Sequence, residues 1–233
     1  MLKPAKSLPI AALILVLCDL IANSATKAAM SSAQASSAVP TTTKATQANP
    51  LRDTLVIPGE RVGTVTRNTT RQDLVKQFGK ARLSDQSVHI GEGSTEPGTR
   101  VDLDQERSFT VIWSDTTRTK PVEVRNLGSA WQTPQGIRVG TPLNQLQQKL
   151  GTFQFFGFAW DYGGTVALEG TKLAQYHKTL VLRLATAPNA PQRAPNDYHA
   201  VIGDRKFSST NPRLQSLGVK VGEMIVRLTP TQR

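Results

Sequence analysis

Two segments of 11 residues, 69–79 and 141–151, match each other across the middle of the chain. Each begins with threonine, carries an apolar residue at its sixth and tenth positions, and ends with glycine. Threonine is a common N-cap, a terminal glycine can adopt the left-handed conformation, and a spacing of four places side chains on one helix face. We therefore expect two short helices, N-capped by Thr69 and Thr141, with Pro142 in the first position of the second helix.

Strand patterns surround these two helices. Alternating or continuous apolar residues predict strands at 55–57, 87–90, 100–104, 109–113 and 122–125, and then at 153–160, 166–168, 179–185, 198–202 and 223–228. Glycine and proline predict loops at 91–98 and 187–196, and residues 212–217 suggest a helical turn. The expected fold class is α+β, with two tandem modules, 51–130 and 131–233. Each module is a short helix followed by an antiparallel β-meander, and the two pack into one body because an isolated core of this size is marginal.

The repeated helix resembles the helix-then-sheet module of SmpA/OmlA-like outer-membrane lipoproteins and of the secreted β-lactamase inhibitor proteins. The residues that carry this resemblance are Thr69, Leu74, Phe78 and Gly79 in the first segment, and Thr141, Leu146, Leu150 and Gly151 in the second. Residues 58–164 also resemble uncharacterised secreted bacterial proteins. The resemblance implies a non-enzymatic protein that binds another protein or an envelope component through its sheet face.

The N-terminus predicts export. Lys3 and Lys6 precede an apolar run at 8–17, the pattern of a signal peptide, which we place at 1–24. Asp19 interrupts the run before it reaches the length of a membrane span, so no transmembrane segment is expected after signal removal. Residues 25–50 are rich in Ala, Ser and Thr and predict a disordered tether. We expect a periplasmic or extracellular protein; lipidation of Cys18, the only cysteine, is the alternative.

Basic residues are concentrated in the second half of the chain. The net charge is +11 overall, and 131–233 hold 12 Lys and Arg against 5 Asp and Glu, whereas 51–130 hold 12 against 11. Such a half is attracted to anionic surfaces, or its cations simply form a solvated face. The expected partner is an envelope protein or an anionic envelope component, and not nucleic acid, which an exported protein seldom meets.

An aromatic row is the candidate binding site. On one extended strand Phe156, Phe158, Trp160 and Tyr162 share a face, and Trp131 could join them. The row is either the interior of a strand buried on both sides or a stacking platform for sugar or peptide near a hairpin turn at 161–164.

Catalytic and metal-binding patterns are weaker. Asp102 and Asp104 share a strand face with Glu106 and Asp115 nearby, a pattern that fits acid–base catalysis, Ca²⁺ or a solvated face. The three histidines, at 89, 177 and 199, lie too far apart in sequence for a zinc pair, and we expect neither a metal nor a cofactor.

Three functions follow from these patterns. The first is a non-enzymatic binding or assembly-support protein of the bacterial cell envelope. The second is a secreted hydrolase acting on cell-wall or polysaccharide material, with Asp102, Asp104, Asp115 or Asp161 as acids. The third is an inhibitor of a secreted enzyme.

Overall fold

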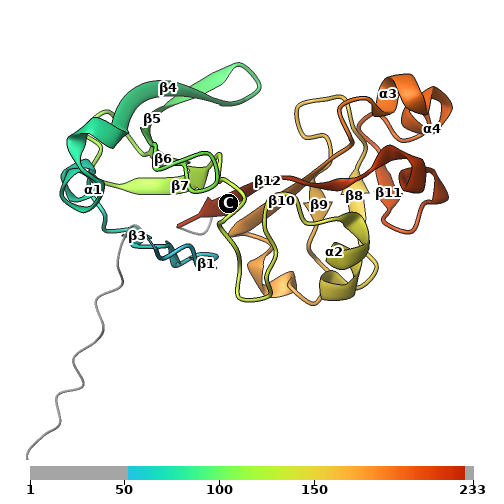
Figure 1. Cartoon of the computed structure of the whole chain (residues 1–233), viewed down its shortest axis with the longest axis horizontal. Helices are drawn as coiled ribbons and strands as arrows, with labels where there is room; N and C mark the ends of the chain where they lie inside the picture. Colours follow the sequence, from blue (N-terminus) through green and yellow to red (C-terminus); the bar gives the residue numbers. More distant parts are fainter. Residues whose placement is uncertain (1–51, 229–233) are drawn as a thin grey trace, which may run out of the picture. The chain divides into compact units, whose positions relative to one another are not determined.

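A six-stranded antiparallel sheet is the main element of the computed structural model, which describes residues 52–228 (Figure 1). The strand order is β10-β12-β7-β6-β5-β4. The bounds are β4 Leu83–Gly91, β5 Ser94–Val101, β6 Phe109–Trp113, β7 Pro121–Arg125, β10 Leu180–Ala185 and β12 Lys220–Arg227. The predicted signal peptide, the whole of the predicted tether and Cys18 lie outside the described residues.

The expected α+β class is confirmed, since short helices accompany antiparallel sheets. Two separate meanders are not observed. Strand β12 of the second half pairs with β7 of the first, with Val226 opposite Val124 and Arg227 opposite Glu123. Strand β10 of the second half pairs with the other side of β12. Three more strands of this half form a separate sheet in the order β11-β8-β9, made of Lys206–Ser208, Gln154–Phe156 and Val166–Ala167. One main sheet therefore combines strands from both halves.

The two matching segments do form equivalent helices, α1 Arg71–Phe78 and α2 Leu143–Leu150. Each ends at a glycine of positive φ, Gly79 at 85° and Gly151 at 84°. Each helix buries the two apolar side chains expected of it, Leu74 with Phe78 and Leu146 with Leu150. The repeat is therefore a repeat of the helix and its approach, not of a whole module.

The N-caps lie one residue later than expected, at Thr70 and Pro142. Thr69 and Thr141 are instead buried in the turn before each helix. Their Oγ1 atoms accept hydrogen bonds from the backbone N–H three residues earlier, at 2.9 Å for Thr69 and 3.0 Å for Thr141. Thr70 forms the capping box with Asp73, whose side chain accepts from the backbone N–H of Thr70 at 3.0 Å.

Strand β6 supplies the centre of the core, with all five of its residues buried. The ring of Phe109 makes edge contacts with Phe78 of α1 at 5.7 Å and with Trp131 at 5.2 Å between centroids. These contacts join α1, β6 and the connection between the two halves. The small sheet of β1 Val56–Ile57, β2 Arg61–Val62 and β3 Val65–Thr66 adds three buried valines to the same core.

Several local expectations were wrong. The loop expected at 91–98 is mostly strand β5. Pro97 is tolerated in this strand because pairing with β6 begins only at Gly98, so the missing N–H of Pro97 costs no hydrogen bond to β6. The region 187–199 contains α3 Ala190–Arg193 and α4 Pro195–His199, each with proline in its first turn, and the strand expected at 198–202 is absent.

The helical turn expected at 212–217 is present as a 3-10 helix, η3 Pro212–Leu217. Two other 3-10 helices lie at Lys80–Arg82 (η1) and Ala174–Tyr176 (η2).

Candidate binding pocket

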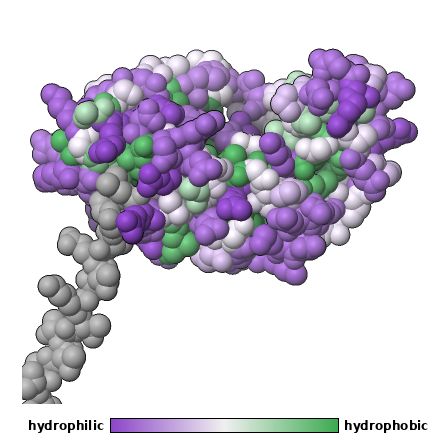
Figure 2. Space-filling model, viewed as in Figure 1, coloured by the Kyte–Doolittle hydropathy of each residue, from purple (hydrophilic) through white to green (hydrophobic). Residues whose placement is uncertain are grey.

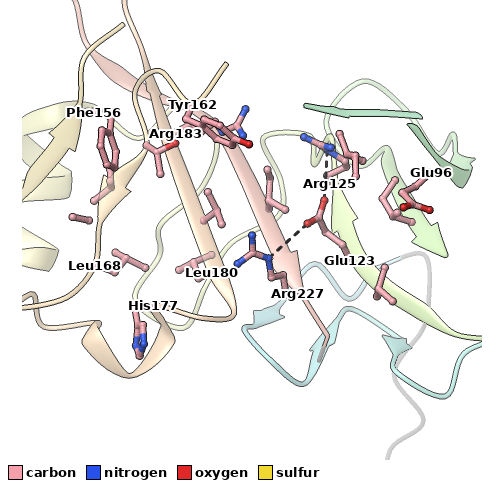
Figure 3. Close-up of a pocket in the computed structure, with 18 of the residues that line it drawn as sticks. Glu96, Glu123, Arg125, Phe156, Tyr162, Leu168, His177, Leu180, Arg183 and Arg227 are labelled. Carbon is pink, nitrogen blue, oxygen red and sulfur yellow. Dashed lines mark ion pairs between the residues drawn. The ribbon is translucent and has the colours of Figure 1, made fainter. Parts of the chain in front are cut away.

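A pocket of about 730 Å³ lies over one face of the main sheet (Figure 3). Alternation along the strands decides which side chains reach it. On β12, Ile225 and Arg227 line the pocket, whereas Met224 and Val226 are fully buried in the core. The other strands contribute to the pocket floor in the same way, with Ile112 from β6, Glu123 and Arg125 from β7, and Val181 and Arg183 from β10.

The charged floor residues form a network of ion pairs. Arg125, whose side chain is only 8% exposed, lies 3.2 Å from Glu223 and 3.7 Å from Glu123. Glu223 also pairs with Arg183 at 3.4 Å, and Glu123 pairs with Arg227 at 4.0 Å. Three arginines thus share two glutamates, which leaves the network with one excess positive charge.

Burial shapes the acid chemistry of this floor. Desolvation raises the pKa of the Glu123 carboxyl, and repulsion from Glu223 adds to this effect. Arg125 and Arg227 act in the opposite direction without cancelling it. Glu123 consequently holds its proton to a higher pH than an ordinary glutamate.

The aromatic wall of the pocket comes from the last residue of β8 and from the loop at 157–165 that follows it, which we call the aromatic loop. Phe156 and Trp160 make an edge contact at 5.8 Å between ring centroids, and Trp160 and Tyr162 make another at 5.4 Å. Phe156 and Tyr162 line the pocket, and Tyr162 is 36% exposed. Three residues of the expected aromatic row therefore lie together at the surface.

The other two candidates, Phe158 and Trp131, lie in the core, at 5% and 1% exposure. An extended strand does not continue to residue 162, because β8 ends at Phe156 and Ala159 has a positive φ of 67°. The change in direction turns Phe158 inward, against Phe155 at 5.5 Å. Trp131 donates its indole N–H to the carbonyl of Arg107 at 3.0 Å, which satisfies it inside the core.

The expected tight hairpin at 161–164 is instead part of a longer loop that crosses to the main sheet. Gly164, with φ of 77°, accepts a backbone hydrogen bond from Leu184 of β10 at 2.8 Å. A Cβ atom on Gly164 would lie 2.1 Å from the carbonyl oxygen of Leu184. Only glycine permits this approach, which fixes the aromatic loop to the edge of the main sheet.

The tip of the β4–β5 hairpin meets the aromatic loop at the margin of the pocket. The backbone N–H of Glu92 donates to the Asp161 carboxylate at 3.3 Å. A hydrogen bond to the Glu92 carboxylate raises the pKa of the Tyr162 phenol. Ile90 and Glu96 of this hairpin line the pocket, and Figure 3 shows Glu96 on the side opposite Phe156. The face of the molecule drawn in Figure 2 is largely hydrophilic, with hydrophobic residues in small groups.

The acids singled out in the sequence do not line this pocket. Asp104 pairs with Arg107 at 2.6 Å, Asp102 with Arg100 at 3.6 Å, and Asp115 accepts from neighbouring hydroxyl groups. Among the described residues, no group of three or more His, Cys, Asp or Glu side chains could hold a metal ion. Sequence reasoning missed the charged floor, although acidic and basic residues two apart on expected strands, such as Glu123 and Arg125, were its visible signal.

Comparisons add little to this geometry. No family model matches the chain, and no curated protein matches it. One similar solved structure is that of the uncharacterized protein yfeY from Escherichia coli, at 14% sequence identity and a TM-score of 0.41. The matched region covers 73% of this chain and 95% of the yfeY chain. Within residues 52–228, no helix has the length and apolar character needed to span a bilayer.

Proposed function

We propose that the chain is an exported, non-enzymatic binding protein of the bacterial cell envelope, and that it holds an envelope component in the pocket over the main sheet. The observation that carries the proposal is the pocket itself. Its volume of about 730 Å³ is in the range of small-molecule sites, which run from roughly 300 to 1,000 Å³.

The composition of the pocket supports a polar ligand that has a ring or another flat body. Phe156 and Tyr162 offer aromatic surface on one wall, and aromatic rings bind the apolar faces of sugars and similar bodies. The floor combines apolar side chains with arginines that are held in place by their glutamate partners. Preorganised polar groups beside a rigid aromatic surface favour binding, because little side-chain freedom is lost when the ligand enters.

The envelope assignment comes from the N-terminal pattern and from the basic second half of the chain. A signal peptide directs the chain out of the cytoplasm and into the cell envelope. Acidic polysaccharides and anionic head groups are abundant there. The excess of Lys and Arg in 131–233 favours encounters with such components.

Binding is tested by titrating the full chain with neutral and acidic oligosaccharides while tryptophan emission is recorded. Trp160 contacts Tyr162, so a ligand on the aromatic wall should change its emission. The variant Tyr162→Ala should weaken binding about tenfold, because stacking on one ring contributes roughly 1 kcal/mol or more. The control Tyr198→Ala removes a tyrosine of α4, outside the pocket, and should bind normally. Equal binding by both variants would contradict the proposal.

A second function, hydrolysis of cell-wall or polysaccharide material, is supported by Glu123. Its raised pKa suits a general acid, and it lies in a pocket with an aromatic wall. Assays of bond cleavage with the same oligosaccharides separate the two functions. A binding protein releases them intact, whereas a hydrolase cleaves them and loses that activity in Glu123→Gln.

A further inference from the structure

The two edges of the main sheet differ in how they are covered. At the β10 edge, the backbone N–H of Leu184 donates to the carbonyl of Gly164 at 2.8 Å, and Thr165 forms an isolated bridge with Arg183. At the other edge, β4 pairs with β5 alone among the described strands (Figure 1). With nine residues, β4 is also longer than any other edge strand within 52–228. This edge of the sheet is therefore open to pairing with another strand.

The direction of the backbone groups along β4 follows from a hydrogen bond just before the strand. The N–H of Asp102 donates to the carbonyl of Arg82 at 2.8 Å, so these two residues form a hydrogen-bonded pair that precedes the β4–β5 ladder. Hydrogen-bonded and non-hydrogen-bonded pairs alternate in an antiparallel ladder, so Asp85 and Ser87 direct their N–H and C=O away from β5. Pro97, opposite Ser87, agrees with this alternation, because a non-hydrogen-bonded pair needs no N–H from it. Within 52–228, no backbone group outside β5 bonds to Asp85 or Ser87.

This part of β4 also lacks the features that usually protect an edge strand. Residues 84–87 are all exposed, and the register shift of the ladder lies beyond them, after His89. The strand contains neither lysine nor proline. Its only carboxylate, on Asp85, pairs with Arg71 at 2.8 Å and with Arg118 at 3.6 Å. The edge therefore presents outward backbone groups without an unpaired carboxylate to repel a second strand.

We infer that β4 is the interface of a homodimer, in which the β4 strands of two copies pair in antiparallel orientation about a twofold axis at Gln86. Asp85 of each copy then lies opposite Ser87 of the other. The outward N–H and C=O groups of these residues bond to each other across the interface. The main sheet becomes continuous through both copies, and this pairing does not depend on the ligand of the pocket.

The side chains of β4 favour a second copy of the chain as the partner. In this register the hydroxyl group of Ser87 faces the carboxylate of Asp85, so a donor lies opposite an acceptor. The amide of Gln86 faces the same amide of the other copy, and an amide both donates and accepts. No two like charges lie directly opposite each other. The strand is thus complementary to itself, as a twofold interface requires.

Sedimentation equilibrium of the full chain over a wide range of protein concentration tests the dimer. The mass should rise from the 25.3 kDa of one chain towards twice that value. Gln86→Lys places two lysines opposite each other and should raise the dissociation constant of the dimer about tenfold. The matched control is Gln154→Lys, which changes an exposed glutamine of β8, a strand that is paired on both sides. This control should dimerise normally.

A charge exchange tests the twofold axis itself. Gln86→Glu should weaken the dimer as Gln86→Lys does, because two carboxylates then face each other. An equal mixture of the two variants should form a mixed dimer, since opposite charges then lie across the axis. Each substitution changes an exposed side chain, so thermal unfolding of the separate variants should match that of the unchanged chain.

A cysteine at the axis traps the dimer even where pairing is weak. Cys18, the only cysteine, is first replaced by serine. Gln86→Cys then brings two sulfur atoms face to face in a non-hydrogen-bonded pair, whose close Cβ atoms suit a disulfide. Mild oxidation should give a covalent dimer with Gln86→Cys and not with Gln154→Cys, and this result supports the pairing at any affinity.

Two results would overturn the inference. The first is a chain that remains monomeric at every concentration and gives no covalent dimer through Gln86→Cys. The second is a dimer that Gln86→Lys and Gln86→Glu leave unchanged, because the two copies would then meet at another surface. Neither result bears on the pocket, which is tested separately by titration with oligosaccharides.

Discussion

Trp160 differs from the other two tryptophans in its surroundings. Trp113 and Trp131 are 0% and 1% exposed, whereas Trp160 is half-buried in the aromatic wall, with its indole N–H bonded to the carbonyl of Gly157 at 2.8 Å. Iodide should therefore quench Trp160 and leave the other two largely unaffected. The measurement uses variants that each retain one tryptophan, with phenylalanine at the other two positions. Equal shielding of all three would mean that the aromatic wall is closed to solvent.

Asp73 links helix α1 to the pH dependence of stability. A hydrogen bond from the Thr70 side chain, followed by one from its backbone, lowers the pKa of Asp73 below its ordinary value of 3.8. Because the folded state binds this proton less readily than the unfolded state, the stabilisation is complete above pH 3.8 and is lost as the pH falls through the lowered value. Asp73→Asn should be less stable than the unchanged chain at pH 7.

The measurement is thermal unfolding of both chains between pH 2 and 7. The difference in melting temperature should shrink as the pH falls, because protonation of the carboxyl group removes its stabilising charge. A difference that does not change with pH would mean that the capping box stabilises α1 without its charge. Thr70→Ala, which removes the N-cap itself, should cost about 1 kcal/mol at pH 7.

The position of the aromatic loop depends on a close backbone contact at Gly164. Gly164→Ala should destabilise the chain by more than about 2 kcal/mol, since positive φ and the contact with Leu184 act together. Gly170 has a similar φ, 80° against 77°, but no atom within 4 Å of an added Cβ. Gly170→Ala should therefore cost only about 1 kcal/mol, and the comparison isolates the contact. Chemical denaturation measures both, and equal losses would contradict the close approach.

At the level of elements, helices were easier to anticipate than the path of the chain between them. Threonine, leucine and glycine in the two matching segments predicted α1 and α2 because caps and face periodicity are local properties. Alternating or continuous apolar residues likewise predicted β6, β7, β10 and β12. The turn at Ala159 was not visible, since a positive φ at alanine is imposed by tertiary contacts rather than by the residue.

The pocket was only partly predictable for the same reason. Phe156, Trp160 and Tyr162 are close in sequence, so local spacing was enough to group them. The ion-pair network at the floor joins Arg125 and Arg183 to Glu223, and these three residues lie on three strands far apart in the chain. Their proximity depends on the pairing of β12 with β7 and β10, and no local pattern specifies that pairing.

At the scale of the whole molecule, the shared main sheet predicts that both halves unfold together. Leu182 of β10 is fully buried, and Leu182→Ala should cost about 2 to 5 kcal/mol. The loss should appear equally in the emission of Trp113, in the first half, and of Trp160, in the second. Urea titration of single-tryptophan chains measures each midpoint. Two midpoints, with only that of Trp160 moved by the substitution, would show that the halves are independent modules.

The central claim is that the pocket over the main sheet binds an acidic envelope component. Its most direct measurement is NMR mapping of backbone amide shifts on the full chain during titration with a glucuronate-containing oligosaccharide. We predict that the largest shifts fall on Tyr162, Thr165, Arg183 and Lys206, which line the pocket. Shifts centred instead on Leu143, Asn211 and Gly218, which line a separate hollow of about 340 Å³ beside α2, would contradict the claim.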